Sequence, residues 1–290
     1  MTVSADTQIT DLAVNDHACL TFGEPEELFD LTAAYVRDGL ASGLKVLWLS
    51  DSPPDQSLAQ LARRGIEVSA AVTAGQMAAV ACADYLLRGG AFTAGQAANW
   101  LHDQMAASRD DGYQGLRLAV DMSWALRPIS GVEQLPDFEE SVAAMLASGT
   151  VSMLCQYDRE RFDPVTLASV AALHTRSVAA ATYYQDAVLR ICRQYAPAGI
   201  RLAGEIDYRA EEPLSLALAE ALRMDGTITI NMADLSFIDA CCLRMIVTAA
   251  RSLPTPRSIV LECSPAIASR FVLFGATDVT GLSVRTIDDR

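Results

Sequence analysis

Short, continuously apolar segments alternate with helical patterns along most of this 290-residue chain, and this alternation constrains the fold most strongly. The helical patterns include EELFDLTAAYVRDGLASG, QSLAQLARRG and AGQAANWLHDQMAASRD. Between them lie segments typical of strands buried on both faces, namely HACLTF (17–22), LKVLWLSD (44–51), GLRLAVDMSWAL (115–126) and TVSMLCQYD (150–158). Strands that alternate with helices predict a parallel sheet covered by helices on both faces.

The same rhythm restarts after the proline and glycine of QYAPAGI (194–200). Here IRLAGEID, TITINMADLSFID, SIVLECS and LSVRTI are expected strands, and EPLSLALAEALRM, ACCLRMIVTAARS and AIASRFVLFGAT are expected helices. In the second of these strands, Ile228, Ile230 and Met232 should face one way, because strand side chains alternate. We therefore expect two α/β domains, divided into a flexible N-terminus (1–13), a first domain (14–180), a connecting helix (181–197) and a second domain (198–290). The last three residues, 288–290, are expected to be frayed.

Composition and charge exclude several classes of function. The chain is 51% hydrophobic and 20% charged, as in globular proteins, and its formal net charge of −14 disfavours binding to nucleic acid or to anionic membranes. The sequence shows neither a secretory signal nor an apolar stretch of the roughly 20 residues that a membrane helix requires. We therefore expect a cytoplasmic protein whose seven cysteines, without a CxxC pair, are reduced thiols.

The start of the first domain resembles a nucleotide-binding domain of the RecA/KaiC type, since a strand, a loop, a helix and a second strand follow in that order. The loop, however, reads GEPEELFD (23–30) where a phosphate loop would read G-x-x-x-x-G-K-[ST]. It lacks the lysine, and Glu24, Glu26, Glu27 and Asp30 bring negative charge where a triphosphate would bind. The loop is thus degenerate and nucleotide binding by the usual route is not expected. Asp121 takes the place of a Walker-B-type acid but can equally serve as a helix cap.

Four spaced motifs in this domain, followed by His174, resemble the MEDS family of sensory domains: DHACLTF, GLASGLKVLWLSD, VDMSWAL and LCQYDRERF. The resemblance implies a domain, over residues 14–180, that senses small organic or hydrocarbon-derived ligands. Ligands of parallel sheets bind beyond the carboxyl ends of the strands. Trp124 and Tyr157 could pack against an apolar ligand or cover the sheet edge. The candidate ligand-binding residues are His17, Cys19, Phe22, Asp121, Trp124, Cys155, Tyr157 and His174.

A metal site is one alternative for part of this set. His17 and Cys19 lie two residues apart on a strand and project to the same side. Together with Cys155 and His174 they would supply two thiolates and two imidazoles for zinc, if the fold brought them together. Nothing in their spacing requires this, and core packing or a hydrogen-bonded histidine is the favoured interpretation. We accordingly expect neither a metal nor a cofactor.

The second domain resembles the STAS domain of anti-sigma factor antagonists. The family pattern, close to D-L-S-x-V-x-F-I-D-S-S-G-L, is matched here by DLSFID (234–239) and by Leu243. In that family a serine at the start of the following helix is phosphorylated by the partner kinase. Here the two serines are replaced by Ala240 and Cys241, and the glycine by Cys242, so control by phosphate at this position is not expected. The resemblance implies a partner-binding or switch region made by Ser236, Asp239, Ala240, Cys241, Cys242 and Arg244.

Taken together, these features predict a cytoplasmic signalling protein that takes part in transcription regulation, with a sensory MEDS input and a STAS-like output. The expected partners are an anti-sigma factor or a related regulatory ATPase and a small organic ligand, with a homodimer left open. No catalytic motif such as G-x-S-x-G or H-E-x-x-H is present, so an enzyme is not expected. Two alternatives are a thiol- or metal-responsive sensor and a residual nucleotide-binding ATPase.

Overall fold

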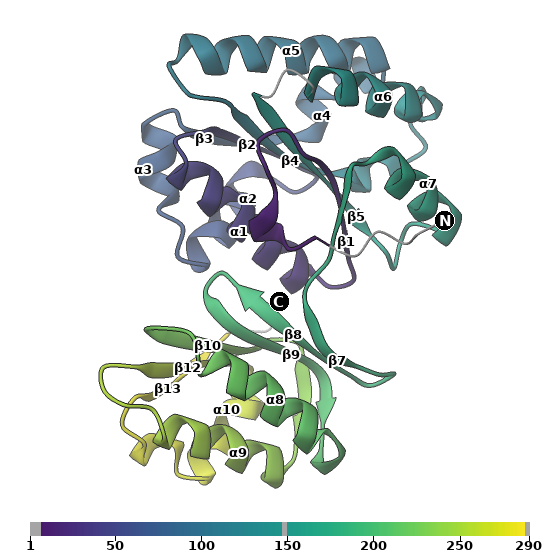
Figure 1. Ribbon diagram of the computed structural model, residues 1–290. Helices are drawn as coiled ribbons and strands as arrows, with labels where there is room; N and C mark the ends of the chain where they lie inside the picture. The colour runs from purple at the N-terminus through teal and green to yellow at the C-terminus, as the bar shows by residue number, and fades with distance from the viewer. Residues whose placement is uncertain (1–6, 147–149, 288–290) are drawn as a thin grey trace. The chain divides into compact units, whose positions relative to one another are not determined.

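The computed structural model describes residues 7–146 and 150–287 of the chain. It forms two compact units, Met1–Ala179 and Ala180–Arg290, which are described separately below. Figure 1 shows both units as ribbons. Within the described residues, no helix is long and apolar enough to cross a bilayer.

The first unit is built on a parallel sheet with the strand order β3-β2-β4-β5-β1-β6. Its strands are β1 (His17–Phe22), β2 (Lys45–Ser50), β3 (Met77–Ala81), β4 (Leu116–Asp121), β5 (Val151–Asp158) and β6 (Arg176–Val178). The predicted parallel α/β sheet is therefore confirmed. No strand was predicted at β3, which lies in an Ala-rich segment.

Helices cover both faces of this sheet because strand side chains alternate between the faces. Leu47 and Leu49 of β2 belong to a core shared with α5 and α6, whereas Trp48 points to the other face and packs edge-on against Phe29 of α1. In Figure 1, α5 and α6 lie together. The helices are α1 (Pro25–Ala41), α2 (Pro54–Arg63), α3 (Val68–Thr73), α4 (Cys82–Tyr85), α5 (Ala94–Asp110), α6 (Leu135–Leu146) and α7 (Pro164–Leu173), with short 3-10 turns η1 (Ile9–Asp11), η2 (Arg88–Gly90), η3 (Met122–Leu126) and η4 (Val132–Gln134).

Of the expected flexible N-terminus, residues 1–6 lie outside the described residues. The same holds for residues 288–290, which were expected to be frayed. For residues 7–13 the prediction is wrong. The backbone N–H of Thr7 donates to the carbonyl of Ser177 at 2.8 Å, which extends the sheet edge beside β6, and Ile9 is buried at 2% exposure. The backbone bond of Thr7 and two buried side chains, Ile9 and Leu12, tie this segment to the unit.

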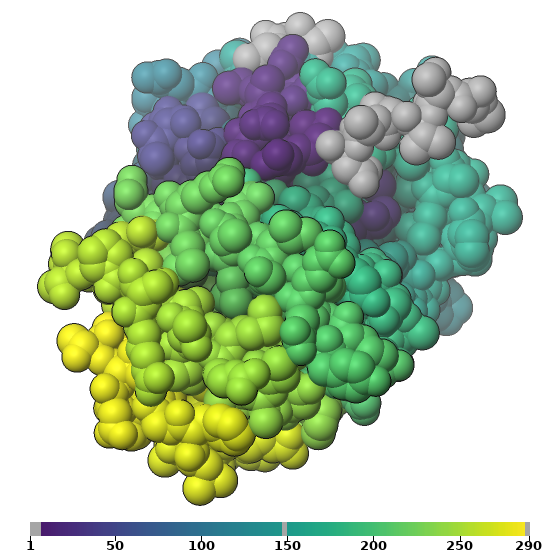
Figure 2. Space-filling view, turned by 60° about the horizontal axis from the view of Figure 1, so that its bottom comes forward, coloured from purple at the N-terminus to yellow at the C-terminus, as the bar shows by residue number. Residues whose placement is uncertain are grey.

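The second unit contains a mixed sheet with the order β13-β12-β10-β9-β8-β7, in which β11 also pairs with β9. Ile228, Ile230 and Met232 join its apolar core, as predicted. The expected strand 227–239 is two strands, β10 and β11. Figure 2 shows the surface of this unit in green to yellow. The elements are β7 (Thr182–Gln185), β8 (Leu189–Tyr195), β9 (Ala198–Ile206), η5 (Tyr208–Ala210), α8 (Glu211–Ala221), β10 (Thr227–Met232), β11 (Leu235–Ile238), α9 (Ala240–Arg251), β12 (Ser258–Cys263), α10 (Pro265–Leu273), η6 (Ala276–Asp278) and β13 (Leu282–Thr286).

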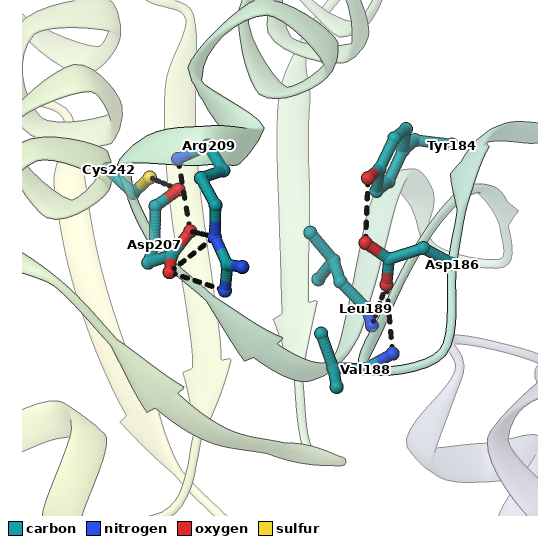
Figure 3. A network of polar contacts seen from close by, with 7 residues as sticks. All are labelled: Tyr184, Asp186, Val188, Leu189, Asp207, Arg209 and Cys242. Atoms are coloured by element: carbon teal, nitrogen blue, oxygen red, sulfur yellow. Dashed lines mark hydrogen bonds and ion pairs between the residues drawn. The ribbon is translucent and has the colours of Figure 1, made fainter.

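The expected connecting helix over residues 181–197 is wrong, because these residues form the antiparallel hairpin of β7 and β8. The Asp186 carboxylate closes the turn by accepting hydrogen bonds from the backbone N–H groups of Val188 and Leu189, both at 2.8 Å (Figure 3). It also accepts one from the Tyr184 hydroxyl at 2.7 Å. The second strand of the hairpin, β8, is stabilised by burial of Leu189 and Ile191 in the core. The helix after Pro164 ends at Leu173, far earlier than the sequence indicated.

Candidate functional site

Four buried side chains with metal-ligating chemistry meet on one face of the first unit's sheet. His17 begins β1 and Cys155 lies in the neighbouring strand β5, while Glu139 reaches them from α6 and His174 from the residue that follows α7. One ligating atom from each of the four lies within 4.8 Å of the others. The side chains of His17, Glu139 and His174 are 0% exposed, and Cys155 is equally buried. We call this set the buried cluster.

The contacts inside the buried cluster converge on Glu139. His17 Nε2 lies 3.0 Å from Glu139 Oε2 and 3.7 Å from the sulfur of Cys155. His174 Nε2 lies 3.7 Å from the same carboxylate oxygen, and the two imidazole rings are 4.0 Å apart. The other carboxylate oxygen accepts a hydrogen bond from the Tyr157 hydroxyl at 3.3 Å. Two rings, a carboxylate and a thiol thus surround a common point.

The orientation of His174 is fixed by the helix that precedes it. Its Nδ1 lies 2.6 Å from the carbonyl oxygen of Val170, which can only accept a hydrogen bond. The proton must therefore sit on Nδ1, and Nε2 presents a lone pair to the cluster. Among the described residues, His174 Nε2 has no hydrogen-bond partner.

Burial and mutual charge set the protonation of these groups. Burial lowers the pKa of His174 to about 4, against the opposing pull of Glu139, so its ring is neutral at pH 7. Burial raises the pKa of Glu139, but contact with His17 and the nearby His174 outweighs it and holds that pKa below its usual range. Burial, helped by Glu139, raises the pKa of the Cys155 thiol well above its usual range. The cluster by itself therefore holds a carboxylate beside a protonated thiol.

The structure brings together three of the four residues considered for a metal site and replaces the fourth. Cys19 is buried and opposite Cys155 in the register of β1 and β5, but it is outside the set of four. Glu139 takes its place and was missed, because an acid in LPDFEESVAAML looks solvent-exposed. Its position would have indicated otherwise: with Leu135, Val142 and Leu146 it forms one buried helical stripe.

The other predicted ligand residues of the first unit lie in the core. Trp124 is fully buried against Phe92, with ring centroids 4.8 Å apart, and Tyr157 is buried against Phe162 at 5.3 Å. Phe22 is 5% exposed. The rings of Trp124 and Tyr157 therefore do not cover an open sheet edge. Tyr157 contacts the buried cluster through its hydrogen bond to Glu139. Asp121 is the cap of η3, accepting from the backbone N–H of Ser123 at 2.9 Å.

The degenerate phosphate loop is filled by the protein's own groups. The backbone N–H of Gly23 donates to the carboxylate of Glu27 at 2.9 Å, and Arg159 lies 3.3 Å from the same oxygen. The Glu27 side chain is 0% exposed. A Cβ placed on Gly23 would clash with the Arg159 guanidinium, so the space above this backbone is already taken. An internal carboxylate thus sits where a phosphate loop would receive a phosphate.

The predicted switch region of the second unit lies mostly on its surface, at the start of α9. Asp239 caps the helix through the N–H of Cys242 at 2.8 Å, and Ala240 and Arg244 are exposed. Cys241 is partly exposed, and its thiol donates to Glu211 at 2.9 Å. Cys242 is buried, with its thiol directed at the carbonyl of Asp207 (Figure 3), so it is a core residue and not a contact residue.

The Ser236 hydroxyl donates to the carbonyl of Gly204 in β9 at 3.0 Å. This bond joins β11 to β9, whose backbones also pair. Ser236 is exposed and therefore accessible at the surface.

Comparison with known proteins identifies the first unit. The family model for the MEDS domain, described as the methanogen/methylotroph DcmR sensory domain, matches residues 16–175. The chain belongs to the MEDS family. This confirms the resemblance found in the sequence, and the matched range contains all four residues of the buried cluster. The MEDS match ends before the hairpin that opens the second unit.

A curated relative agrees with this assignment. The chain is 28% identical over 160 residues to the transcriptional repressor DcmR of Methylorubrum extorquens, a match that covers 53% of this chain and 57% of the repressor. The chain thus spans a little more than half the length of that relative.

Solved structures give weaker matches. A KaiC-like protein from Pyrococcus horikoshii is 12% identical, with a TM-score of 0.46 over 63% of this chain and 79% of that one. The flagellar accessory protein FlaH from Methanocaldococcus jannaschii is 10% identical, with a TM-score of 0.46 over 65% and 83%. Both scores are below 0.5, and the fold described above rests on the strand order alone.

Proposed function

We propose that this chain is a cytoplasmic signalling protein without enzymatic activity, in which the MEDS unit senses a small ligand and the second unit acts as a STAS-like output. The output binds an anti-sigma factor or a related regulatory ATPase through the start of α9. The curated relative is a transcriptional repressor, which supports a role in transcription regulation. The net charge of −14 favours a protein partner over nucleic acid.

The observation that carries the output half of this proposal is the exposed start of α9. A polar, accessible surface is formed by Ser236, Asp239, Ala240, Cys241 and Arg244, which we call the α9 surface. Beside it, a groove of about 340 Å³ runs between α8 and α9. Its lining combines apolar and polar groups: Ser215, Leu218, Ala219, Leu222, Arg244, Met245, Thr248 and Ala249. An apolar groove with a charged rim suits a partner protein.

The chemistry of Cys241 favours a contact surface over a reactive thiol. The hydrogen bond to Glu211 raises the pKa of Cys241, so the nucleophilic thiolate is disfavoured at pH 7. The other cysteines are buried. A thiol is also not a substrate for a kinase that phosphorylates serine. We infer that partner binding here is controlled from the sensory unit and not by phosphate at residue 241.

The absence of enzymatic activity is proposed from the phosphate loop. Glu27 already accepts the Gly23 N–H and is paired with Arg159 inside the protein. A nucleotide phosphate placed there would face a buried carboxylate, and repulsion between like charges in a buried site is strong. This supports a sensory unit that has kept a nucleotide-binding architecture without its ligand.

Capture of partners by the full-length protein tests this proposal. The immobilised chain would be incubated with lysate of its native host, and bound proteins identified by mass spectrometry. We expect an ATPase-type regulator to be retained by the wild type and lost with Cys241→Asp or Arg244→Glu, which place negative charge on the α9 surface. Arg251→Glu is the matched control, because Arg251 is exposed at the opposite end of the same helix.

Retention of the same protein by all four chains would show that the α9 surface is not the binding site. Capture of no ATPase-type regulator by the wild type would remove the antagonist function altogether. The sensory assignment of the first unit would stand in either case.

A further inference from the structure

We propose that the buried cluster of His17, Glu139, Cys155 and His174 binds one divalent late first-row transition metal ion of the Zn²⁺ class in a closed, four-coordinate site. This goes beyond the proposed function and does not depend on it, because it concerns only residues of the first unit. It is carried by the convergence of four ligating atoms within 4.8 Å of one another in a fully buried setting.

The donor set selects the class of ion. Two imidazole nitrogens, one sulfur and one carboxylate oxygen are the ligands of Zn²⁺ and of Co²⁺, whereas Mg²⁺ and Ca²⁺ prefer oxygen ligands only. Glu139 and Cys155 come from different elements, as do the two histidines, so a metal would join β1, β5, α6 and the end of α7. A mixed set of this kind is difficult to explain as core packing, because buried polar groups are ordinarily paired.

Two of the separations between ligand atoms fit a tetrahedral site. Metal bonds of about 2.0 to 2.3 Å at tetrahedral angles place ligand atoms about 3.3 to 3.8 Å apart. The separation of Cys155 Sγ and His17 Nε2 is 3.7 Å, as is that of His174 Nε2 and Glu139 Oε2. The contact of His17 with Glu139 is shorter, at 3.0 Å, and would need to open slightly.

The charge of the ligands is an independent reason to expect a divalent ion in the buried cluster. On binding, the S–H bond of Cys155 breaks, its proton passes to solvent and a metal–sulfur bond forms. The thiolate and the Glu139 carboxylate then bring two negative charges, and the neutral rings of His17 and His174 bring none. A divalent ion makes this buried site neutral, which avoids the cost of an uncompensated buried charge.

Neighbouring groups orient two of the four ligands, His174 and Glu139, as they do in known metal sites. The Nδ1–H of His174 donates to the carbonyl of Val170, which directs the Nε2 lone pair at the site. The Tyr157 hydroxyl holds the other oxygen of Glu139. His174 Nε2, which has no hydrogen-bond partner among the described residues, and Glu139 Oε2, which lies 3.0 Å from His17 Nε2, are the atoms that would face the ion.

With four protein ligands the site keeps no open position, and this favours a structural or sensing ion over a hydrolytic one. The ion would tie His174, and with it the end of α7, to the sheet.

The test is cobalt binding by the full-length protein, made metal-free with a chelator and dialysed. We expect one equivalent of Co²⁺ per chain, with visible absorption typical of tetrahedral cobalt and a near-ultraviolet band from thiolate-to-cobalt charge transfer. Zn²⁺ should displace the cobalt. Cys155→Ser should lose the charge-transfer band, and His174→Ala should weaken binding by about tenfold or more.

Two matched variants control for the other cysteines. Cys19→Ala alters a buried thiol that faces Cys155 in the strand register but lies outside the set, and Cys241→Ala alters the partly exposed thiol of the second unit. Both should keep the wild-type spectrum. Circular dichroism verifies the fold of each variant, and the wild-type titration needs no variant at all. Failure of metal-free wild type to bind Co²⁺, or an unchanged spectrum in folded Cys155→Ser, would overturn the proposal.

Discussion

Asp121 shows how burial changes the chemistry of a residue that the sequence left with two interpretations. Its carboxylate accepts hydrogen bonds from the backbone N–H groups of Ser123 at 2.9 Å and Asp51 at 3.4 Å, as a cap does. Burial raises the pKa of Asp121 more than these bonds lower it. The folded protein therefore holds this proton up to a higher pH than the unfolded chain.

This has a consequence for Asp121→Asn. A group whose folded pKa is raised contributes stability below its unfolded pKa and loses it as the pH rises through the folded value. The amide does not ionise, and its single oxygen can accept the bond from Ser123, whereas the longer bond from Asp51 to the second carboxylate oxygen is lost at every pH. Relative to the wild type, the free energy of unfolding of Asp121→Asn should therefore increase as the pH rises above about 4, the pKa of an aspartate in the unfolded chain. Urea unfolding at several pH values measures this, and a difference that stays constant with pH would contradict it.

Single residues also show the limit of sequence reasoning about the site. His17, Cys155 and His174 could be selected because their side chains are characteristic metal ligands. Glu139 was missed, and the available signal was its position on the apolar stripe of α6, which packs against this face of the sheet. Cys19 was selected on its alternation with His17, which places it on the correct face but not within reach of the common point.

At the scale of elements, α9 depends on Asp239, the capping residue that precedes it. Asp239 accepts the N–H of Cys242 at 2.8 Å, and aspartate and asparagine are equally good at this position. Asp239→Ala should lower the free energy of unfolding by about 1 kcal/mol, and Asp239→Asn should leave it nearly unchanged. Chemical denaturation of the full-length variants distinguishes them. Equal losses in both would mean that the charge of Asp239, and not its cap, stabilises the helix.

A second prediction at this scale concerns nucleotide binding at the loop before α1. The backbone N–H of Gly23 is already bonded to Glu27, which is paired with Arg159. The full-length protein should therefore bind no ATP in the presence of magnesium. Isothermal titration with Mg-ATP should give no heat of binding beyond dilution. Saturable binding would restore the nucleotide-binding alternative and would require a site other than this loop or a rearrangement of it.

The elements that the sequence missed are those whose conformation depends on tertiary pairing. Buried parallel strands such as β2, β4 and β5 are continuous apolar runs, and they were predictable. The hairpin of β7 and β8 was not, because its pattern was interpreted as a continuation of the helix after Pro164. The hairpin forms because Asp186 closes a turn and because Leu189 and Ile191 are buried in the core. Likewise β3 is a short Ala-rich segment whose strand conformation comes from pairing with β2.

At the scale of the whole molecule, the chain combines a MEDS unit with a mixed-sheet unit that begins at Ala180. His174 lies in the short segment that leads along the chain from the first unit to the second. In our proposals, events in the buried cluster act on the end of α7, and the output is read at the α9 surface. Joining the two proposals, we expect occupancy of the cluster to change α9, and this coupling is the central claim.

Hydrogen–deuterium exchange of the metal-free full-length protein, with and without one equivalent of Zn²⁺, tests this claim most directly. We predict slower amide exchange in Pro164–Val178, because the ion fixes His174, together with a change in exchange in Ala240–Arg251. His174→Ala should abolish both effects. Protection confined to Pro164–Val178, with α9 unchanged, would contradict the coupling of sensor to output.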